Sequence, residues 1–417
     1  MAYLPSFRPR PQSVIRERNV ILVDNFSSTA VVRDFIKSVL EASKQGYEEL
    51  DIDLSELGES PYFPNVLVPI STFLDNIKFE RNIGINLINA PSILAYTNFC
   101  APQPSGLTSQ SPNILNKVWK FDSSEDVFKL VTEYMDAIYK ADVFDGENVL
   151  NWLEWCLNEV MDNVIQHAES QAGYVMGQIH PHSKHIAFCI ADAGRGIFES
   201  LRTSTDYWPK DAADALTLAI KEGVTRDKNI GQGNGLWGLQ EVVRNSAGKL
   251  TLSSAGKSLS VDNGANIKDV PYLNPRRGGT IVDFQMDYSV KISLIDILGG
   301  YQPESLKVLN STNDSGEIVK YSLIKQKSGF GTRKSGERIR NEIVNLMNVS
   351  GKKVDINFDG LAIVSSSFAD ELIGKLFVGL GPLVFSQKVT LNGMNDTIAA
   401  IINKAMMQRL VQENTKT

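Results

Sequence analysis

The sequence of 417 residues has few cysteines and contains no long apolar run. Its three cysteines, Cys100, Cys156 and Cys189, follow no spacing that a metal site or a disulfide framework requires. An odd and sparse set of cysteines is typical of free thiols in a reducing compartment, so we expect a cytoplasmic protein. No apolar run approaches the ~20 residues that a membrane-spanning helix needs, and the first 18 residues lack the apolar segment of a signal peptide.

An excess of positive charge is also absent, because 42 Lys and Arg residues stand against 48 Asp and Glu residues. The formal net charge of -6 provides no basic field for nucleic acid, so we expect neither nucleic acid nor a membrane as a partner. The composition is that of a globular protein, with 42% hydrophobic and 22% charged residues. At ~150 residues per domain, the length suggests about three domains.

Histidine is scarce as well, and three of the four histidines, His180, His182 and His185, lie in one short segment. Clustered histidines invite interpretation as a metal site. No cysteine or carboxylate in this segment completes such a site, and the segment separates two expected strands, 173–179 and 185–191. We therefore expect an exposed turn.

The segment 150–168 has the apolar periodicity of a helix, with its apolar stripe on one face. A carboxylate and an amide one turn apart on the other face can reach one small ligand together. The alternative interpretation is that this face is an ordinary helix face exposed to solvent. The polar residues at helical spacing on that face are Glu159, Asp162, Asn163 and Gln166.

A carboxylate followed by two spaced glycines stands where the expected strand 185–191 ends. These residues are Asp192, Gly194 and Gly196. Glycine allows another backbone to approach closely and allows conformations that other residues avoid. The pattern suits a buried carboxylate beside a ligand.

A second glycine-rich turn opens the expected helix 236–245. It contains Gly231, Gly233 and Gly235. Backbone N–H groups at a helix start attract phosphate, so this turn is a candidate phosphate site.

Taken in order, these segments resemble the ATP-binding domain of the GHKL superfamily, which includes type II topoisomerases, histidine kinases and anti-sigma-factor serine kinases. Glu159-x-x-Asp162-Asn163 is similar to its first box and Asp192-x-Gly194-x-Gly196 to its second. Gly231-x-Gly233-x-Gly235 is similar to the third box, and Gly278-Gly279-Thr280 to the closing element of the domain.

The resemblance implies ATP and Mg²⁺ as cofactors and a role for each matching residue. Asn163 would hold Mg²⁺, a hard ion that prefers oxygen ligands, against the phosphates. Asp192 would accept a hydrogen bond from the adenine amino group, and Glu159 is the candidate catalytic base. The remaining residues implied in nucleotide binding are Gly194, Gly196, Gly231, Gly233, Gly235, Leu236 and Thr280.

The segment from Ser365 to Lys375 resembles a STAS-like domain of unknown function, together with Gly331-x-Arg333 and Arg338-x-Arg340. STAS domains include anti-anti-sigma factors, which are partners of GHKL-type kinases. Where STAS phosphoproteins carry Asp-Ser-Ser-Gly, this chain has Ser-Ser-Ser-Phe, so phosphorylation stays open.

Ser366 is the candidate phosphoacceptor of this serine cluster. The alternative is that Ser365 or Ser366 simply caps the following helix. Asp370 and Glu371 lie in the next turn, and we expect them to repel a phosphate.

The alternation of strands and helices predicts an α/β (α+β) fold with a GHKL sandwich around a mixed sheet at its centre. Residues 101–113 are rich in Pro, Ser and Gly and are expected to form a linker. The predicted organisation is a flexible basic arm over 1–18, a small and faintly STAS-like α/β domain over 19–105, the GHKL domain over 106–290 and the STAS-like domain over 291–417.

We expect a cytosolic ATP-binding regulatory protein that binds a protein partner through its STAS-like modules. ATP hydrolysis, phosphotransfer by a serine/threonine kinase and nucleotide binding without turnover all stay open, although Glu159 argues against the third. The scarcity of histidine argues against a histidine autokinase. A homo-oligomer stays open as well.

Overall fold

The computed structural model describes residues 13–58, 61–111, 113–141, 148–204, 206–224, 235–261, 265–274, 276–290, 318–325, 330, 333–350 and 352–414. The chain forms two compact units, Met1–Ile297 and Leu298–Thr417. Each unit combines helices with a β-sheet, which confirms the predicted α/β (α+β) class.

A four-stranded sheet opens the N-terminal unit, with its strands in the order β1-β2-β3-β4. The last three strands run parallel, as expected for strands joined by helices, and β1 pairs antiparallel with β2. The elements are β1 (Val14–Glu17), β2 (Val20–Val23), α1 (Thr29–Lys44), β3 (Glu49–Asp53), α2 (Pro64–Arg81), β4 (Gly84–Ile88) and α3 (Ser92–Ala95).

The last part of the predicted flexible arm over residues 1–18 forms a strand, β1. Val14 pairs with Val23 and is buried, so this segment is part of the sheet. Arg18 adopts a positive φ of 57°, which permits the tight turn into β2. A short hairpin therefore starts inside the predicted arm.

An eight-stranded mixed sheet forms the centre of the N-terminal unit, in the order β11-β10-β9-β12-β8-β7-β6-β5. Strands β7 and β8 pair antiparallel, as the sequence predicts. The strands are β5 (Gln103–Pro104), β6 (Trp119–Phe121), β7 (Gly173–His180), β8 (His185–Asp192), β9 (Lys249–Ser254), β10 (Lys257–Val261), β11 (Ala265–Asp269) and β12 (Thr280–Asp287).

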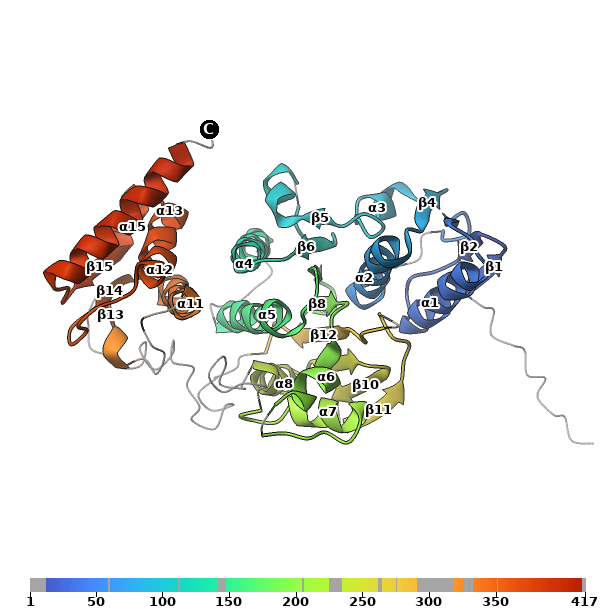
Figure 1. Ribbon diagram of the computed structural model, residues 1–417. Helices are drawn as coiled ribbons and strands as arrows, with labels where there is room; N and C mark the ends of the chain where they lie inside the picture. The colour runs from blue at the N-terminus through green and yellow to red at the C-terminus, as the bar shows by residue number, and fades with distance from the viewer. Residues whose placement is uncertain are drawn as a thin grey trace, which may run out of the picture. The chain divides into compact units, whose positions relative to one another are not determined.

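Helices cover both faces of this sheet. Helices α4 (Ser124–Lys140) and α5 (Asn148–His167) lie on one side of β8 and β12, and α2 lies on the other (Figure 1). Helix α8 (Gly235–Asn245) packs beside α5, while α6 (Gly196–Arg202) and α7 (Ala212–Ala219) contact β9 and β10. Residues 105–110 form a 3₁₀ helix after β5, so the predicted linker is partly structured.

Helix α2 is buried on nearly all sides, which is typical of a helix between two layers. Its apolar residues share one core with Tyr174 and Met176 of β7 and with Cys189 and Ala191 of β8. The predicted 19–105 domain therefore packs on the central sheet as part of one compact unit.

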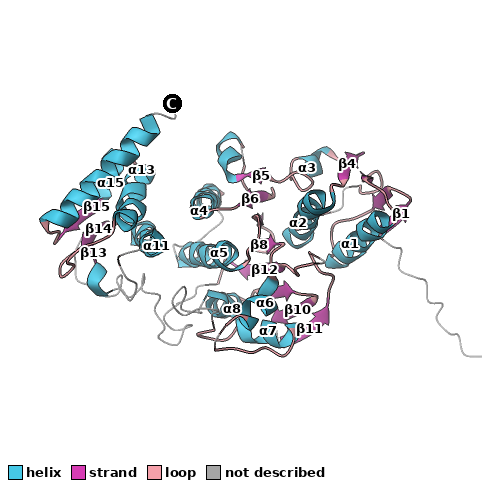
Figure 2. Cartoon of the chain, in the orientation of Figure 1, coloured by secondary structure: helices cyan, strands magenta, loops and turns pink. Residues whose placement is uncertain are grey.

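The C-terminal unit contains three parallel strands in the order β13-β14-β15. Figure 2 distinguishes the helices and strands of this unit by colour. A helix of the π type, η3 (Asp370–Gly374), interrupts the helical segment that follows β14. The other elements are β13 (Ile318–Ser322), η2 (Leu323–Lys325), α11 (Arg333–Ser350), β14 (Lys353–Asn357), α12 (Ser366–Ala369), α13 (Lys375–Leu380), α14 (Pro382–Lys388), β15 (Val389–Asn392) and α15 (Asp396–Asn414).

Within the part of the chain that the structure describes, no helix combines the length and apolar character that crossing a membrane requires.

Candidate functional site

Helix α5 positions Glu159 and Asn163. Its apolar stripe, which includes Leu157, Val160 and Met161, is buried against the sheet and α4. Glu159 and Asn163 are half-buried on the other side of the helix. Because they are four residues apart, they lie about one turn, or ~6 Å, from each other along the helix axis.

The start of α8 lies directly against Glu159. A Cβ atom on Gly235 would lie 2.5 Å from Glu159 Oε2, so a larger residue there would displace the Glu159 carboxylate. One turn later, a Cβ atom on Gly238 would lie 2.3 Å from Cη2 of Trp155, which shows that Trp155 packs against α8. Leu236 follows in the first turn of α8 and is half-buried.

Asp192 ends β8 with a buried carboxylate that is 3% exposed. The backbone N–H of Gly194 donates to Asp192 Oδ1 over 2.8 Å, and the Thr280 hydroxyl donates to the same carboxylate. Thr280 faces Asp192 in the register of β12 and β8. Burial raises the pKa of Asp192 to about 7, although both hydrogen bonds favour the ionised form.

Glycine is required at two positions after Asp192, by a close backbone contact at Gly194 and by a positive φ at Gly196. A Cβ atom on Gly194 would lie 2.1 Å from the carbonyl oxygen of Ala168, just after α5. Gly196 has a φ of +76°, and a Cβ atom there would lie 2.7 Å from Ser254 Oγ. The close approach expected from the spacing of these glycines is therefore present.

Helix α5 connects the two ends of this candidate site. Glu159 and Gly235 lie at one end, and the turn after Asp192 contacts Ala168 at the other. Nine residues separate Glu159 from Ala168, which corresponds to about 13 Å of helix. Asn163 lies between them along the helix.

Part of the predicted site lies outside the described residues. Gly231 and Gly233 of the third glycine segment belong to this part, and so does the preceding segment 225–230. The described members lie at or near α5, and their roles in nucleotide binding stay predictions, as do those of the two glycines. The described members are Glu159, Asn163, Asp192, Gly194, Gly196, Gly235, Leu236 and Thr280.

A Mg²⁺ ion would depend on Asn163 and on the phosphates. In the described ranges, no group of three or more His, Cys, Asp or Glu side chains is arranged to hold a metal ion. Mg²⁺ bound with a nucleotide usually keeps several waters and takes one or two protein ligands, so such a group is not required. The half-buried Asn163 carboxamide, one turn from Glu159, fits this arrangement.

Three residues that support the Asp192 end were missed by sequence reasoning. Ser254 Oγ accepts from the N–H of Ile197 over 2.9 Å and donates to the carbonyl of Gly279 over 2.8 Å. Arg195 Nε donates to the His167 carbonyl at the end of α5, and Asn274 donates to the Ala193 carbonyl. Their partners are remote in sequence, so no local pattern predicts them.

The raised pKa of Asp192 predicts a pH-dependent stability that Asp192→Asn removes. Between pH 4 and pH 7 the folded carboxyl retains a proton that the unfolded chain has lost, so the free energy of unfolding of wild type falls as pH rises through this range. The decrease relative to the variant is expected to be on the order of 3 kcal/mol.

Urea unfolding followed by tryptophan fluorescence measures this effect, because all five tryptophans lie in the N-terminal unit, between Trp119 and Trp237. Parallel pH profiles for wild type and Asp192→Asn would contradict the raised pKa.

In the C-terminal unit, Ser365 caps the helix that begins with α12. Its Oγ accepts from the Phe368 N–H over 3.1 Å, which confirms the capping interpretation for Ser365. Ser366 is the first residue of α12 and is exposed. Its hydroxyl is accessible at a helix start.

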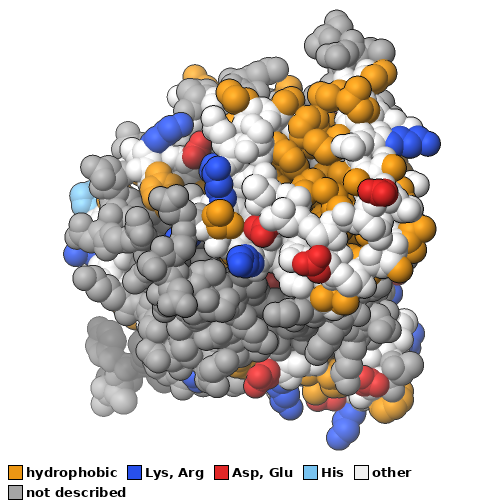
Figure 3. All heavy atoms as spheres, turned by 90° about the vertical axis from the view of Figure 1, so that its left-hand side faces the viewer, with side chains coloured by type: hydrophobic (Ala, Val, Ile, Leu, Met, Phe, Trp, Pro, Cys, Tyr) orange, Lys and Arg blue, Asp and Glu red, His pale blue; other side chains and the backbone are white. Residues whose placement is uncertain are grey.

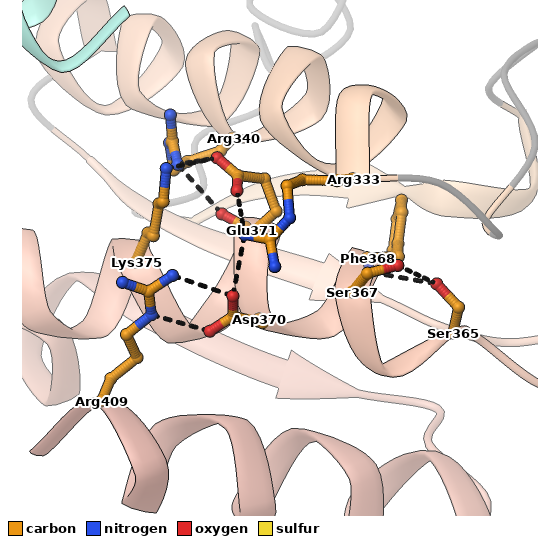
Figure 4. A network of polar contacts seen from close by, with 9 residues as sticks. All are labelled: Arg333, Arg340, Ser365, Ser367, Phe368, Asp370, Glu371, Lys375 and Arg409. Carbon is orange, nitrogen blue, oxygen red and sulfur yellow. Dashed lines mark hydrogen bonds and ion pairs between the residues drawn. The ribbon is translucent and has the colours of Figure 1, made fainter. Parts of the chain in front are cut away.

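The two acidic residues of the next turn are ion-paired. Asp370 contacts Arg333 over 3.0 Å and Arg409 over 2.7 Å (Figure 4). The pKa of the Asp370 carboxyl lies below its usual value, chiefly because Arg409 donates to it.

Glu371 is buried and contacts three cations, Arg333 at 3.0 Å, Arg340 at 2.6 Å and Lys375 at 3.0 Å. The expectation that these acids present free negative charge to a phosphate is therefore wrong, because their charges are compensated.

Comparison with known proteins identifies one part of the chain. Residues 335–399 match the family model of the STAS-like domain of unknown function (DUF4325). This agrees with the resemblance of the Ser365–Lys375 segment, and the match lies wholly in the C-terminal unit. No curated protein matches the sequence.

Proposed function

We propose that the N-terminal unit binds Mg²⁺-ATP along α5 and that the protein is an ATP-dependent regulatory protein with a STAS-like partner-binding module. The observation that carries this proposal is the buried carboxylate of Asp192, which Gly194 and Thr280 hold at the end of β8. A buried carboxylate is costly unless it is hydrogen-bonded.

Asp192 retains acceptor capacity for a ligand. An ionised carboxylate has about four lone-pair sites, and the protein donors described here occupy two of them. The amino group of adenine is a donor of the required type. A ligand amino group at Asp192 would therefore offset part of the cost of burial.

The other end of α5 supports the phosphates and the chemistry. The first N–H groups of α8 have no partner within their helix, and their partial positive charge attracts anions. Gly235 brings Glu159 to this helix start. A carboxylate in this place suits activation of a water or hydroxyl nucleophile, which favours turnover over simple binding.

Incubation of the full chain with γ-labelled ATP and Mg²⁺ tests the proposal. Label in free phosphate indicates an ATPase, and label in protein indicates a kinase. Calorimetry with a non-hydrolysable ATP analogue measures binding separately from turnover. Absence of binding at millimolar nucleotide would overturn the proposed function.

The C-terminal unit has apolar side chains available for a partner. Leu383 on α14 is 71% exposed, and Met407 and Val411 on α15 are 61% and 60% exposed. Figure 3, which views Figure 1 from its left-hand side, shows apolar side chains gathered on one face. An exposed apolar area of this kind supports a protein partner.

Phosphorylation of Ser366 is the second candidate function. Its support is the exposed position of Ser366 at a helix start, where N–H groups and the helix dipole stabilise a phosphate. The compensated charges of Asp370 and Glu371 remove the expected repulsion. The side chain of Arg333, at the start of α11, is 55% exposed.

Mass spectrometry after incubation with ATP and Mg²⁺ is expected to find phosphate on the peptide that contains Ser366. The signal should disappear in Ser366→Ala and persist in Ser365→Ala. If the chain modifies itself, the signal should also disappear in Glu159→Gln. An unmodified peptide at high coverage, also after addition of cell extract, would leave the C-terminal unit as a plain binding module.

A further inference from the structure

The last turn of α2 contacts the loop that leads into β12. Glu80 accepts a hydrogen bond from Asn274 Nδ2 through its Oε1 atom, over 3.2 Å. The two residues are 194 positions apart in the sequence. Helices α1 and α2 and the four-stranded sheet form the N-terminal layer of this unit. The contact joins this layer to the loop before Thr280, and Thr280 is the strand partner of Asp192.

Asn274 organises this loop and is itself 1% exposed. Its Nδ2 also donates to the Ala193 carbonyl over 3.0 Å, and its Oδ1 accepts from the N–H groups of Arg276 and Arg277. Its own carbonyl accepts from the Gly278 N–H over 2.8 Å. One buried amide thus joins the turn after Asp192 to the loop before β12.

The same loop holds the backbone around Asp192. The N–H of Gly279 donates to the Gly194 carbonyl over 2.9 Å. Gly278 and Gly279 have φ values of +104° and +73°, and a Cβ atom on Gly279 would lie 2.6 Å from the Asp192 carbonyl oxygen. A displacement of this loop would therefore move Thr280 and the donors that hold the Asp192 carboxylate.

The N-terminal layer anchors the loop by a second contact. Leu273 is buried in the core that α1, α2 and the four-stranded sheet form. Glu80 and Leu273 together fasten the segment before β12 to the N-terminal layer. The loop is therefore attached on one side to α2 and on the other to the Asp192 end of the site.

We infer that Glu80 is a positioning residue for the Asp192 end of the site and acts through Asn274. Glu80 lies outside every motif that resembles the GHKL boxes. The effect of Glu80 on nucleotide affinity rests on the proposed function, whereas its effect on the order of the loop before β12 does not. In this arrangement a change in the N-terminal layer alters nucleotide affinity at Asp192.

Three variants of the full chain test this inference. Glu80→Ala removes the acceptor, whereas Glu80→Gln retains an oxygen that can accept from Asn274. Asn65→Ala is the matched control, because Asn65 Nδ2 donates to Asp283 Oδ2 over 3.1 Å and so forms a single hydrogen bond from α2 to β12 itself. Among the hydrogen bonds of the described residues, none joins the Asn65 side chain to the loop before Thr280.

Hydrogen exchange measured by mass spectrometry is the first readout. Glu80→Ala is expected to accelerate exchange of the Gly194 and Gly279 amides roughly 2- to 10-fold, the effect of losing one hydrogen bond. Glu80→Gln and Asn65→Ala should leave these amides close to wild type. Equal acceleration in Glu80→Ala and Asn65→Ala, or none in Glu80→Ala, would overturn the inference.

Calorimetry with ATP and Mg²⁺ is the second readout. A roughly 2- to 10-fold loss of affinity in Glu80→Ala, with rescue in Glu80→Gln, supports the inference. Unchanged affinity in Glu80→Ala would overturn it. If wild type binds no ATP, the proposed function fails, and the exchange rates still decide whether Glu80 orders the loop around Asp192.

Discussion

Asp192→Asn and Asn163→Ala are each expected to weaken ATP binding about 5- to 150-fold. Losing a buried hydrogen-bond partner costs roughly 1–3 kcal/mol, which corresponds to this range of affinity. The ionised Asp192 carboxylate offers acceptors only, whereas the amide of the variant can present N–H donors to the ligand amino group. Asn163→Ala removes the carboxamide oxygen that would hold Mg²⁺ against the phosphates.

Asp283→Asn is the matched control for Asp192→Asn. Asp283 is also a carboxylate of the central sheet whose pKa burial raises, in this case to about 6. Its partner is Asn65 of α2, so it points toward the face of the sheet opposite α5. Calorimetry should find wild-type ATP affinity in Asp283→Asn. Unchanged affinity in both Asp192→Asn and Asn163→Ala would refute the site.

The elements that carry the candidate site could be predicted because their patterns are strong and local. Helix α5 has a long apolar stripe, and β7 and β8 are apolar runs separated by a polar turn. Ser123 accepts from the Asp126 N–H as the N-cap of α4, and serine is among the residues preferred at this position. The burial of Asp192 could be predicted because this residue stands at the end of a strand, before two spaced glycines.

Contacts between remote segments could not be predicted from one sequence. The Glu80–Asn274 contact joins residues that no local period relates, and it depends on how α2 packs on the sheet. The charges of Asp370 were misjudged for the same reason. Arg333 and Arg409 lie 37 and 39 residues from Asp370, on two other helices.

The two small sheets of the chain share one arrangement. Strands β2, β3 and β4 run parallel in chain order, and so do β13, β14 and β15. In both cases helices join the strands. The shared order agrees with the faint STAS-like resemblance of residues 19–105, which stays a prediction because the family match covers only residues 335–399, within the C-terminal unit.

The helix after the middle strand is covered differently in the two sheets. Helix α2 follows β3 and packs against the central sheet, whereas α15 packs on η3 and α13, which follow β14. Through Glu80 and Asn274, the N-terminal layer is connected to the loop beside Asp192, at one end of the candidate site. This connection gives the layer a physical route to influence the proposed ATP binding.

Glu159→Gln is expected to retain ATP binding and to lose turnover by about 10²- to 10⁴-fold, the usual contribution of a general base. Glutamine has nearly the same shape as glutamate, so the close approach of Gly235 to this side chain is preserved. The amide cannot take a proton from water or a hydroxyl at neutral pH. Binding and chemistry should therefore separate in this one variant.

Glu241→Gln is the matched control for Glu159→Gln, because Glu241 is another poorly exposed glutamate, on α8, and its partner is Arg244. Calorimetry with a non-hydrolysable analogue should show unchanged affinity in both variants. Release of labelled phosphate, or labelling of protein, should fall only in Glu159→Gln. If turnover in Glu159→Gln stays within a few-fold of wild type, Glu159 is not the base, and another group near the start of α8 must activate the nucleophile.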